Sequence, residues 1–125
     1  MPKTAIVIYS DPKTNSEEAL GRVFNAMFLA YELKEKKQDV ALIFQGTGVR
    51  WVSELATPEH PANSLYTEVA NTVVGACQGC ADVFGATEDV KSTDVALVAE
   101  KAIPGTSGVI DLSRYLDEGY RLVTF

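Results

Sequence analysis

The chain contains two cysteines, Cys77 and Cys80, and only Gln78 and Gly79 lie between them. The apolar run 72–76 precedes the pair, and an amphipathic helical pattern follows it, so the pair is predicted where a strand passes into a helix. Free N–H groups and a partial positive charge at a helix N-terminus favour a thiolate over a thiol. Because the thiolate is the nucleophilic form of cysteine, this placement indicates sulfur chemistry.

Several chemistries fit a C-x-x-C motif at a strand–helix junction. Cys77 could accept a sulfane sulfur and pass it on as a persulfide, or the two thiols could cycle between dithiol and disulfide. A third interpretation is structural, with both cysteines acting as small buried hydrophobic side chains. A zinc site would use Cys77, Cys80 and His60, the single histidine, which is one ligand short of a structural site. We therefore expect no metal.

Gly46 and Gly48 give a short glycine motif that is also found in dinucleotide-binding loops. Here the motif follows the second predicted strand instead of the first, and Trp51 stands where the third glycine would be. The chain also lacks the Gly-Lys-Ser/Thr sequence of a phosphate-binding loop. We expect no nucleotide or other cofactor.

The elements that must position the cysteines form an alternating pattern. The apolar runs 5–9 and 40–44 flank a segment, 16–37, whose apolar residues recur every three or four positions. Strand, helix and strand in this order predict a parallel βαβ unit with a right-handed crossover. Further strands are expected at 72–76, 95–98 and 120–125. The prediction is one α/β domain over residues 1–125, a three-layer α/β/α sandwich with a mostly parallel sheet of about five strands.

Ligands of parallel sheets bind at the carboxyl ends of the strands. Besides the cysteines, Gln78 and Gly79, the residues expected at this edge are Ser10, Asp11, Gly46, Gly48, Arg50 and Trp51. Arg50 could lower the pKa of Cys77, or it could be a solvated surface charge. Trp51 could line a pocket, or it could pack in the helix core or an oligomer contact.

Composition excludes several classes of function. The chain has 125 residues, 46% of them hydrophobic and 22% charged, which is ordinary for a globular protein. A net charge of −6 argues against direct nucleic-acid binding, which needs clustered basic residues. No apolar run approaches the roughly 20 residues of a membrane-spanning helix. The N-terminal residues do not have the layout of a signal peptide, so a cytoplasmic location is expected.

Taken in order, five segments resemble the DsrE/DsrF-like family of small sulfur-handling proteins, and together they span nearly the whole chain. They are the opening strand 6–10, the long helix, the segment 40–49 with Gln45, Gly46 and Gly48, the cysteine segment 76–85, and the ending 119–125. The ordered set, with a cysteine after the third strand, is more specific than any one segment.

The resemblance implies a three-layer domain that assembles into homo- or hetero-oligomers. It also implies that a cysteine after the third strand accepts and relays persulfide sulfur between protein donors and acceptors. Cys77 occupies that position, whereas Cys80 is additional to the single-cysteine relays; it could resolve the persulfide, assist binding or be inert. Many members have no established substrate. An oligomeric small-molecule-binding or regulatory module with incidental thiols therefore stays open beside the disulfide chemistry.

Overall fold

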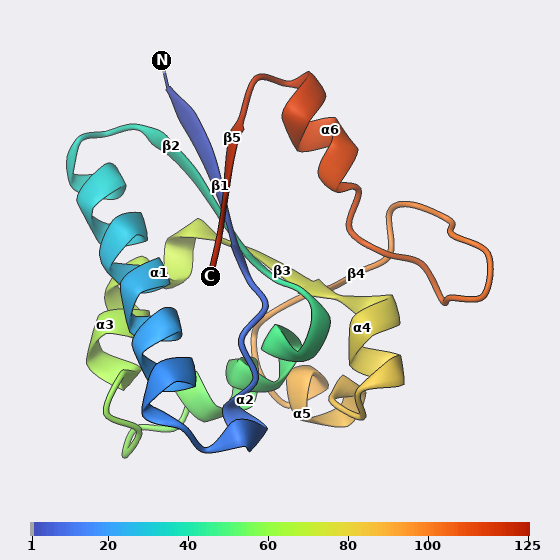
Figure 1. Cartoon of the computed structure of the whole chain (residues 1–125), viewed down its shortest axis with the longest axis horizontal. Helices are drawn as coiled ribbons and strands as arrows, with labels where there is room; N and C mark the ends of the chain where they lie inside the picture. The colour runs from blue at the N-terminus through green and yellow to red at the C-terminus, as the bar shows by residue number, and fades with distance from the viewer. Residues whose placement is uncertain (1) are drawn as a thin grey trace.

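A computed structural model describes residues 2–125 and shows a single α/β domain built on a five-stranded parallel sheet (Figure 1). The spatial order of the strands is β4-β3-β2-β1-β5. The strands are β1 (Lys3–Ile8), β2 (Asp39–Phe44), β3 (Val73–Cys77), β4 (Leu97–Val98) and β5 (Arg121–Thr124). The helices are α1 (Glu17–Glu35), α2 (Trp51–Leu55), α3 (Asn63–Val69), α4 (Gln78–Val83), α5 (Thr87–Lys91) and α6 (Leu112–Asp117). Short 3-10 turns are η1 (Pro12–Thr14), η2 (Gly46–Arg50) and η3 (Ala70–Thr72).

The order of the strands explains the three layers. From β1 to β4 each new strand is added on the same side of the previous one, and helices α1 to α5 lie in these connections. The last connection then crosses the sheet to place β5 on the other side of β1. Because crossovers between parallel strands are right-handed, this reversal of direction puts α6 on the opposite face. The predicted α/β/α sandwich is confirmed, and the sheet is parallel throughout.

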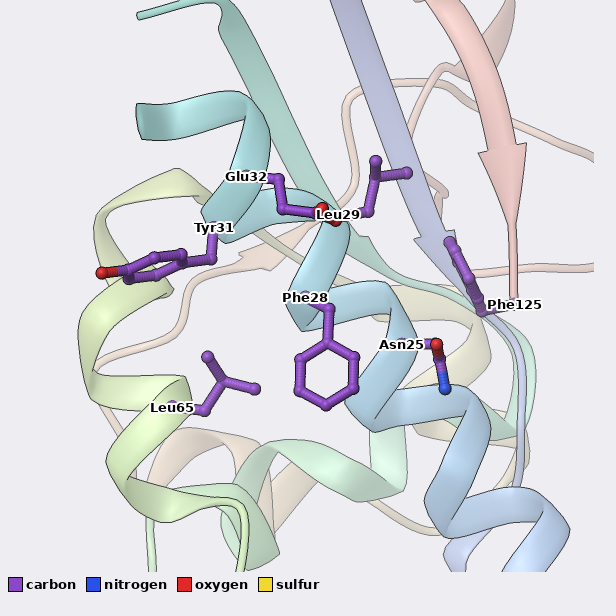
Figure 2. Close-up of a pocket in the computed structure, with 7 residues that line it drawn as sticks. All are labelled: Asn25, Phe28, Leu29, Tyr31, Glu32, Leu65 and Phe125. Carbon is purple, nitrogen blue, oxygen red and sulfur yellow. The ribbon is translucent and has the colours of Figure 1, made fainter. Parts of the chain in front are cut away.

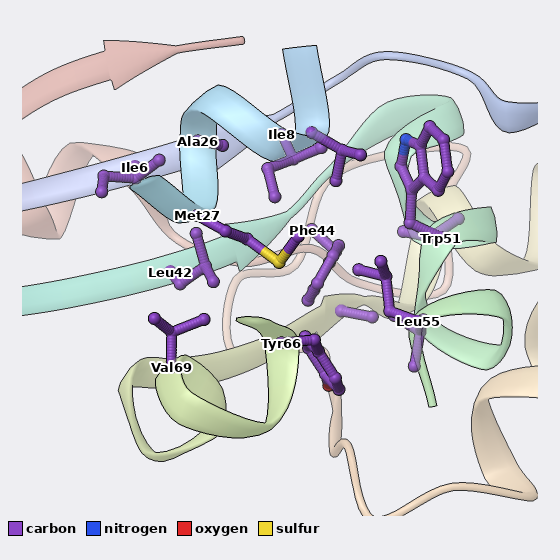
Figure 3. Close-up of a cluster of buried hydrophobic side chains, with 14 of the residues drawn as sticks. Ile6, Ile8, Ala26, Met27, Leu42, Phe44, Trp51, Leu55, Tyr66 and Val69 are labelled. Carbon is purple, nitrogen blue, oxygen red and sulfur yellow. The ribbon is translucent and has the colours of Figure 1, made fainter. Parts of the chain in front are cut away.

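Alternation along the strands divides the core into two parts. Side chains at even positions, such as Ile6, Leu42 and Phe44, join the larger cluster under α1, α2, α3 and α5 (Figure 3). Side chains at odd positions, such as Val7 and Ile43, join a smaller cluster with Tyr115 of α6. Burial of both strand faces accounts for the continuous apolar runs that predicted these strands.

Helix α1 packs on the sheet through a stripe of small and flexible apolar side chains. Its fully buried residues include Val23, Ala26 and Met27, which recur at helical spacing. The Ser16 hydroxyl caps the helix by accepting a hydrogen bond from the Ala19 N–H group at 3.1 Å. Asn15, which also has the side chain of a capping residue, instead takes a left-handed conformation that closes η1.

Gly48 lies where the turn after β2 passes against the end of β1. A Cβ atom at this position would lie 2.0 Å from the Ile8 carbonyl oxygen, far inside van der Waals contact. The Gly48 N–H group also donates to the Gln45 carbonyl at 2.9 Å, which closes the turn. Only glycine allows this approach, so Gly48 determines how closely the turn after β2 packs against the end of β1.

We expect Gly48→Ala to destabilise the protein by about 3 kcal/mol or more, because backbone atoms must move to accommodate the methyl group. Gly21→Ala is the matched control. Gly21 lies within α1, and its Cβ would meet nothing within 4 Å. That substitution should stabilise the helix by about 0.5–1 kcal/mol. Urea denaturation of both variants measures the difference, and an unchanged midpoint for Gly48→Ala would contradict the close approach.

Candidate functional site

The two cysteines lie where neighbouring connections leave the sheet in opposite directions. From β3 the chain passes into α4 and α5, whereas from β4 it crosses the other face toward α6 (Figure 1). Such a divergence opens a crevice at the carboxyl ends of parallel strands. Cys77 is the last residue of β3 and also the N-cap of α4. The predicted strand–helix junction is therefore present.

Cys77 is fully buried, yet its pKa is lowered from the ordinary value of 9.0 to about 6. The largest cause is a hydrogen bond from the Cys80 thiol, and burial opposes it by disfavouring the charged form. Backbone N–H groups of Cys80, Ile110 and Gly79 add further hydrogen bonds to the sulfur. Near neutral pH, Cys77 is accordingly a thiolate inside a set of donors.

Cys80 is half-buried and has the opposite shift, because its pKa is raised above the ordinary value. Its proton is held in the hydrogen bond to Cys77, and burial acts in the same direction. A hydrogen bond from the Gly46 backbone works against both. The pair therefore divides its roles, with Cys77 as the anion and Cys80 as the proton donor.

The origin of this thiolate agrees only in part with the one that the sequence suggests. Backbone N–H groups of Gly79 and Cys80, in the first turn of α4, do lower the pKa of Cys77, but the Cys80 thiol is the largest cause. Helix α4 has only six residues, and its Gly79 N–H group donates to the Gly108 carbonyl at 2.8 Å. The stabilisation of the Cys77 anion comes mainly from individual donors, one of which, at Ile110, lies 33 positions further along the chain. The site therefore depends on a segment that local sequence does not connect with the cysteines.

That segment is residues 99–110, which we name the strap. Lys101 and Val109 join its two ends through a pair of antiparallel backbone hydrogen bonds of 2.9 Å. Asp82 of α4 accepts a hydrogen bond from Ser107 and holds the middle of the strap. Residues 99–107 are exposed. The C-terminal end of the strap packs beside Cys77, and no local pattern in the sequence predicts this contact.

Four of the predicted edge residues form a separate polar group. The Arg50 guanidinium pairs with the Asp11 carboxylate at 2.8 Å and donates to the Phe84 carbonyl at 3.2 Å. The Trp51 indole N–H group donates to the Ser10 carbonyl at 2.9 Å, while its ring is buried in the larger core cluster. Arg50 thus ties the end of α4 to the turn after β1, and it is not among the causes that lower the pKa of Cys77.

The remaining predicted residues lie around the sulfurs. Gly46 supplies a backbone hydrogen bond to Cys80, and Gly79 is buried between the cysteines. Gln78 begins α4 and is half-buried. The predicted edge is therefore divided into a sulfur group and the polar group around Arg50, with Gly48 positioning the turn that joins them.

Tyr9 is a residue at the site that sequence reasoning assigned only to the first strand. Its side chain is 41% exposed, and its ring packs against Gly46, where a Cβ would lie 3.2 Å from the ring and the left-handed backbone (φ 56°) would strain any other residue. Burial raises the pKa of the Tyr9 phenol, and the nearby Cys80 and Cys77 raise it further. Tyr9 follows β1 directly, so the sequence could have placed it at the carboxyl edge of the sheet together with Ser10 and Asp11.

An apolar groove lies away from the sulfurs, between α1 and α3 (Figure 2). It has a volume of about 520 Å³. Seven residues line it: Asn25, Phe28, Leu29, Tyr31, Glu32, Leu65 and Phe125. Phe28 and Tyr31 are 47% and 36% exposed, which makes this an uncovered aromatic surface.

Within residues 2–125, His, Cys, Asp and Glu side chains do not gather in any group of three that could hold a metal ion. His60 lies edge-on to Trp51 and accepts a hydrogen bond from the Ala62 N–H group. Over the same residues, no helix has both the length and the apolar character needed to cross a membrane.

The hydrogen bond from Cys80 predicts how the Cys77 thiol titrates. In Cys80→Ala the principal donor is lost, so the pKa of Cys77 should rise from about 6 toward the ordinary value of 9.0. Cys80→Ser keeps a hydroxyl donor and should hold the pKa between these limits. Thiolate absorbance as a function of pH measures both variants, each of which has Cys77 as its single cysteine. Equal midpoints in the two would contradict the role of this hydrogen bond.

Comparison with known proteins places the fold and the family. The chain is 31% identical over 121 residues to the uncharacterized protein MJ0733 of Methanocaldococcus jannaschii, covering 97% of this chain and 93% of that protein. The structure is similar to that of the ychN protein of E. coli, with a TM-score of 0.62, 20% identity and complete coverage of both chains. It is also similar to BT1422, a conserved protein of unknown function from Bacteroides thetaiotaomicron, with a TM-score of 0.61 and 17% identity. That match covers 98% of this chain and 95% of the other.

At these identities the two solved structures support the fold alone. The sequence match is broader, because residues 2–125 fit the DsrE/DsrF-like family from end to end. With the sheet order, the strand–helix junction and the cysteine after β3 all in place, the chain belongs to the DsrE/DsrF-like family.

Proposed function

We propose that this protein is a persulfide carrier that holds a sulfane sulfur on Cys77 and relays it between protein partners. The observation that carries the proposal is the Cys77 thiolate, with a pKa of about 6, held by the Cys80 thiol and by backbone N–H groups. A structural cysteine in an apolar core would have a raised pKa instead. Membership of a family with a sulfur-relay fold supports the same function.

The transfer is a thiol exchange in both directions. In loading, the Cys77 thiolate attacks the outer sulfur of a donor persulfide, R–S–SH. The donor S–S bond breaks, its electron pair leaves on R–S⁻, and Cys77 becomes Cys77–S–SH. In release, an acceptor thiolate attacks the same outer sulfur and Cys77 leaves as a thiolate. A low pKa suits Cys77 to this second step, because a more acidic thiol is a better leaving group.

Partners must reach a sulfur that the strap and Cys80 cover. Two exposed apolar side chains flank this region: Val83 on α4, 70% exposed, and Ile103 in the strap, 40% exposed. We infer that protein donors and acceptors dock on this side and reach Cys77 past Cys80. For the exposed aromatic groove between α1 and α3 we infer a contact with another copy of the chain in a homo-oligomer.

A dithiol–disulfide oxidoreductase is the second candidate. The hydrogen bond between the Cys80 thiol and Cys77 favours it, because a disulfide also requires neighbouring sulfurs. In that reaction the Cys77 thiolate attacks a substrate disulfide, and Cys80 then resolves the mixed disulfide as it loses its proton. The raised pKa of Cys80 slows this second step near neutral pH, so we place this function behind the relay.

Intact mass after incubation with inorganic polysulfide tests the proposal. We expect the native protein to gain the mass of one sulfur atom and to lose it again on addition of a thiol. Cys77→Ser should not load. Cys80→Ser keeps the acceptor and should load, with slower release because the donor that stabilises the departing Cys77 thiolate is weakened.

Three outcomes separate the candidates. Normal loading of Cys77→Ser would overturn the assignment of the acceptor. A loss of two hydrogens in place of a gain of sulfur would indicate the oxidoreductase. If the native protein neither loads nor oxidises and resists alkylation, the thiols are structural, and a small-molecule-binding or regulatory module would replace both candidates.

A further inference from the structure

Gln45 has the one buried side-chain polar atom without a hydrogen-bond partner among residues 2–125. This atom is the amide oxygen Oε1. An unsatisfied buried acceptor costs about 1–3 kcal/mol, so native proteins rarely leave one without a reason. Gln45 follows β2 directly, and its backbone is extended (φ −133°, ψ 158°), with its N–H group bonded to the Ile8 carbonyl at 3.0 Å.

The register of the sheet places Gln45 between Tyr9 and Cys77. In the last paired row, Phe44 is opposite Ile8 of β1 on one side and opposite Ala76 of β3 on the other. The next row therefore consists of Tyr9, Gln45 and Cys77. Adjacent strands are about 4.8 Å apart, so these are direct neighbours at the carboxyl edge.

Alternation places the three side chains on one face. Phe44 and Ala76 belong to the larger cluster, and Cys77 belongs to the smaller cluster on the opposite face. Gln45 continues the extended backbone after Phe44, so its side chain turns to the face of Cys77. The unpartnered oxygen is thus on the face that holds the sulfur, at the edge where a sulfane sulfur would be added.

We propose that Gln45 is a positioning residue that keeps the bound sulfane sulfur protonated, an inference that rests on the proposed relay. Its Oε1 atom accepts a hydrogen bond from the outer sulfur of Cys77–S–SH. A sulfur atom loaded on Cys77 would be added on this face, and its S–H group is a donor of the kind that the oxygen lacks.

The protonation state decides what a persulfide can do. The anion Cys77–S–S⁻ is a nucleophile, whereas the neutral Cys77–S–SH presents an electrophilic outer sulfur to an acceptor thiolate. In the transfer the bond between the two sulfurs breaks, its electron pair goes to the Cys77 sulfur, and the proton stays on the sulfur that moves to the acceptor. Gln45 thus acts on the outer sulfur of the S–S bond, and the donors around Cys77 act on the inner sulfur.

Few titratable groups surround this position. Cys80 approaches from α4 and Tyr9 from the end of β1, and both are neutral near pH 7 because each has a raised pKa. From the opposite layer, Tyr115 and Tyr120 belong to the same hydrophobic cluster as Cys77. The charged groups of the surrounding elements have partners of their own. Arg50 and Asp11 pair with each other, Asp82 of α4 accepts hydrogen bonds from Ser107 and Thr87, and Asp111, next to Ile110, accepts one from Ser113.

The test uses protein loaded with inorganic polysulfide and follows alkylation of the Cys77 persulfide by iodoacetamide over a range of pH, with the site located by peptide mass. Only the anion reacts, so the midpoint reports the acidity of the persulfide. We expect Gln45→Leu to lower this midpoint by about 0.5–1 pH unit, the value of one hydrogen bond to the protonated form. Above the midpoint, sulfur transfer to 2-mercaptoethanol should fall by about three- to tenfold for the same reason.

Two controls separate this role from a structural one. Gln45→Glu keeps an acceptor oxygen and adds a negative charge that disfavours the anion, so its midpoint should stay at or above that of the native protein. The unloaded Cys77 thiol should titrate with the same midpoint in Gln45→Leu and in the native protein, because a general disturbance of the site would shift it as well.

The outcomes also separate this inference from the proposed function. If the native protein does not take up sulfur, the relay itself is wrong. If it loads but the persulfide midpoint in Gln45→Leu is unchanged, Gln45 does not contact the sulfane sulfur. A midpoint that rises in Gln45→Leu would overturn the inference in the other direction, because it would mean that Gln45 presents its amide N–H₂ group and stabilises the anion.

Discussion

A buried thiolate must be surrounded by hydrogen-bond donors, and this requirement organises the structure. Cys77 is removed from solvent, yet its pKa is lowered, which is possible only because donors from three places compensate for the lost hydration. Cys80 donates from its side chain and its backbone, Gly79 donates from the backbone of α4, and Ile110 donates from the end of the strap. Helix α4 and the strap therefore have to lie beside Cys77, because they supply the hydrogen-bond donors that stabilise its thiolate.

The fold provides these donors through a reversal in strand order. Because the last crossover runs against the first three, the connection after β4 crosses the face that holds the Cys77 side chain. Within the polar group, Arg50 pairs with Asp11 and donates to the Phe84 carbonyl, which fixes the end of α4 against the turns after β1 and β2. A parallel sheet built in one direction would leave this face of Cys77 uncovered.

Residues near the cysteines in sequence were easier to assign than residues near them in space. The junction at Cys77, the long helix and the strands were predictable, because apolar periodicity is a local property. The contacts of Arg50, Trp51 and Tyr9 were not predictable, because each side chain had several possible partners and local sequence does not distinguish among them. In the structure Arg50 pairs with Asp11, Trp51 packs in the core and donates to Ser10, and Tyr9 lies near the two sulfurs.

The sequence by itself determined the fold class, the family resemblance and the cysteine pair at the end of a strand. These depend on alternation, spacing and order, which are properties of neighbouring residues. Tertiary structure alone decided which cysteine carries the charge, that Ile110 donates to it, and that Gln45 stands beside it with an unused oxygen. Those facts depend on strand register and on a crossover between distant segments, and the pattern of neighbouring residues encodes neither.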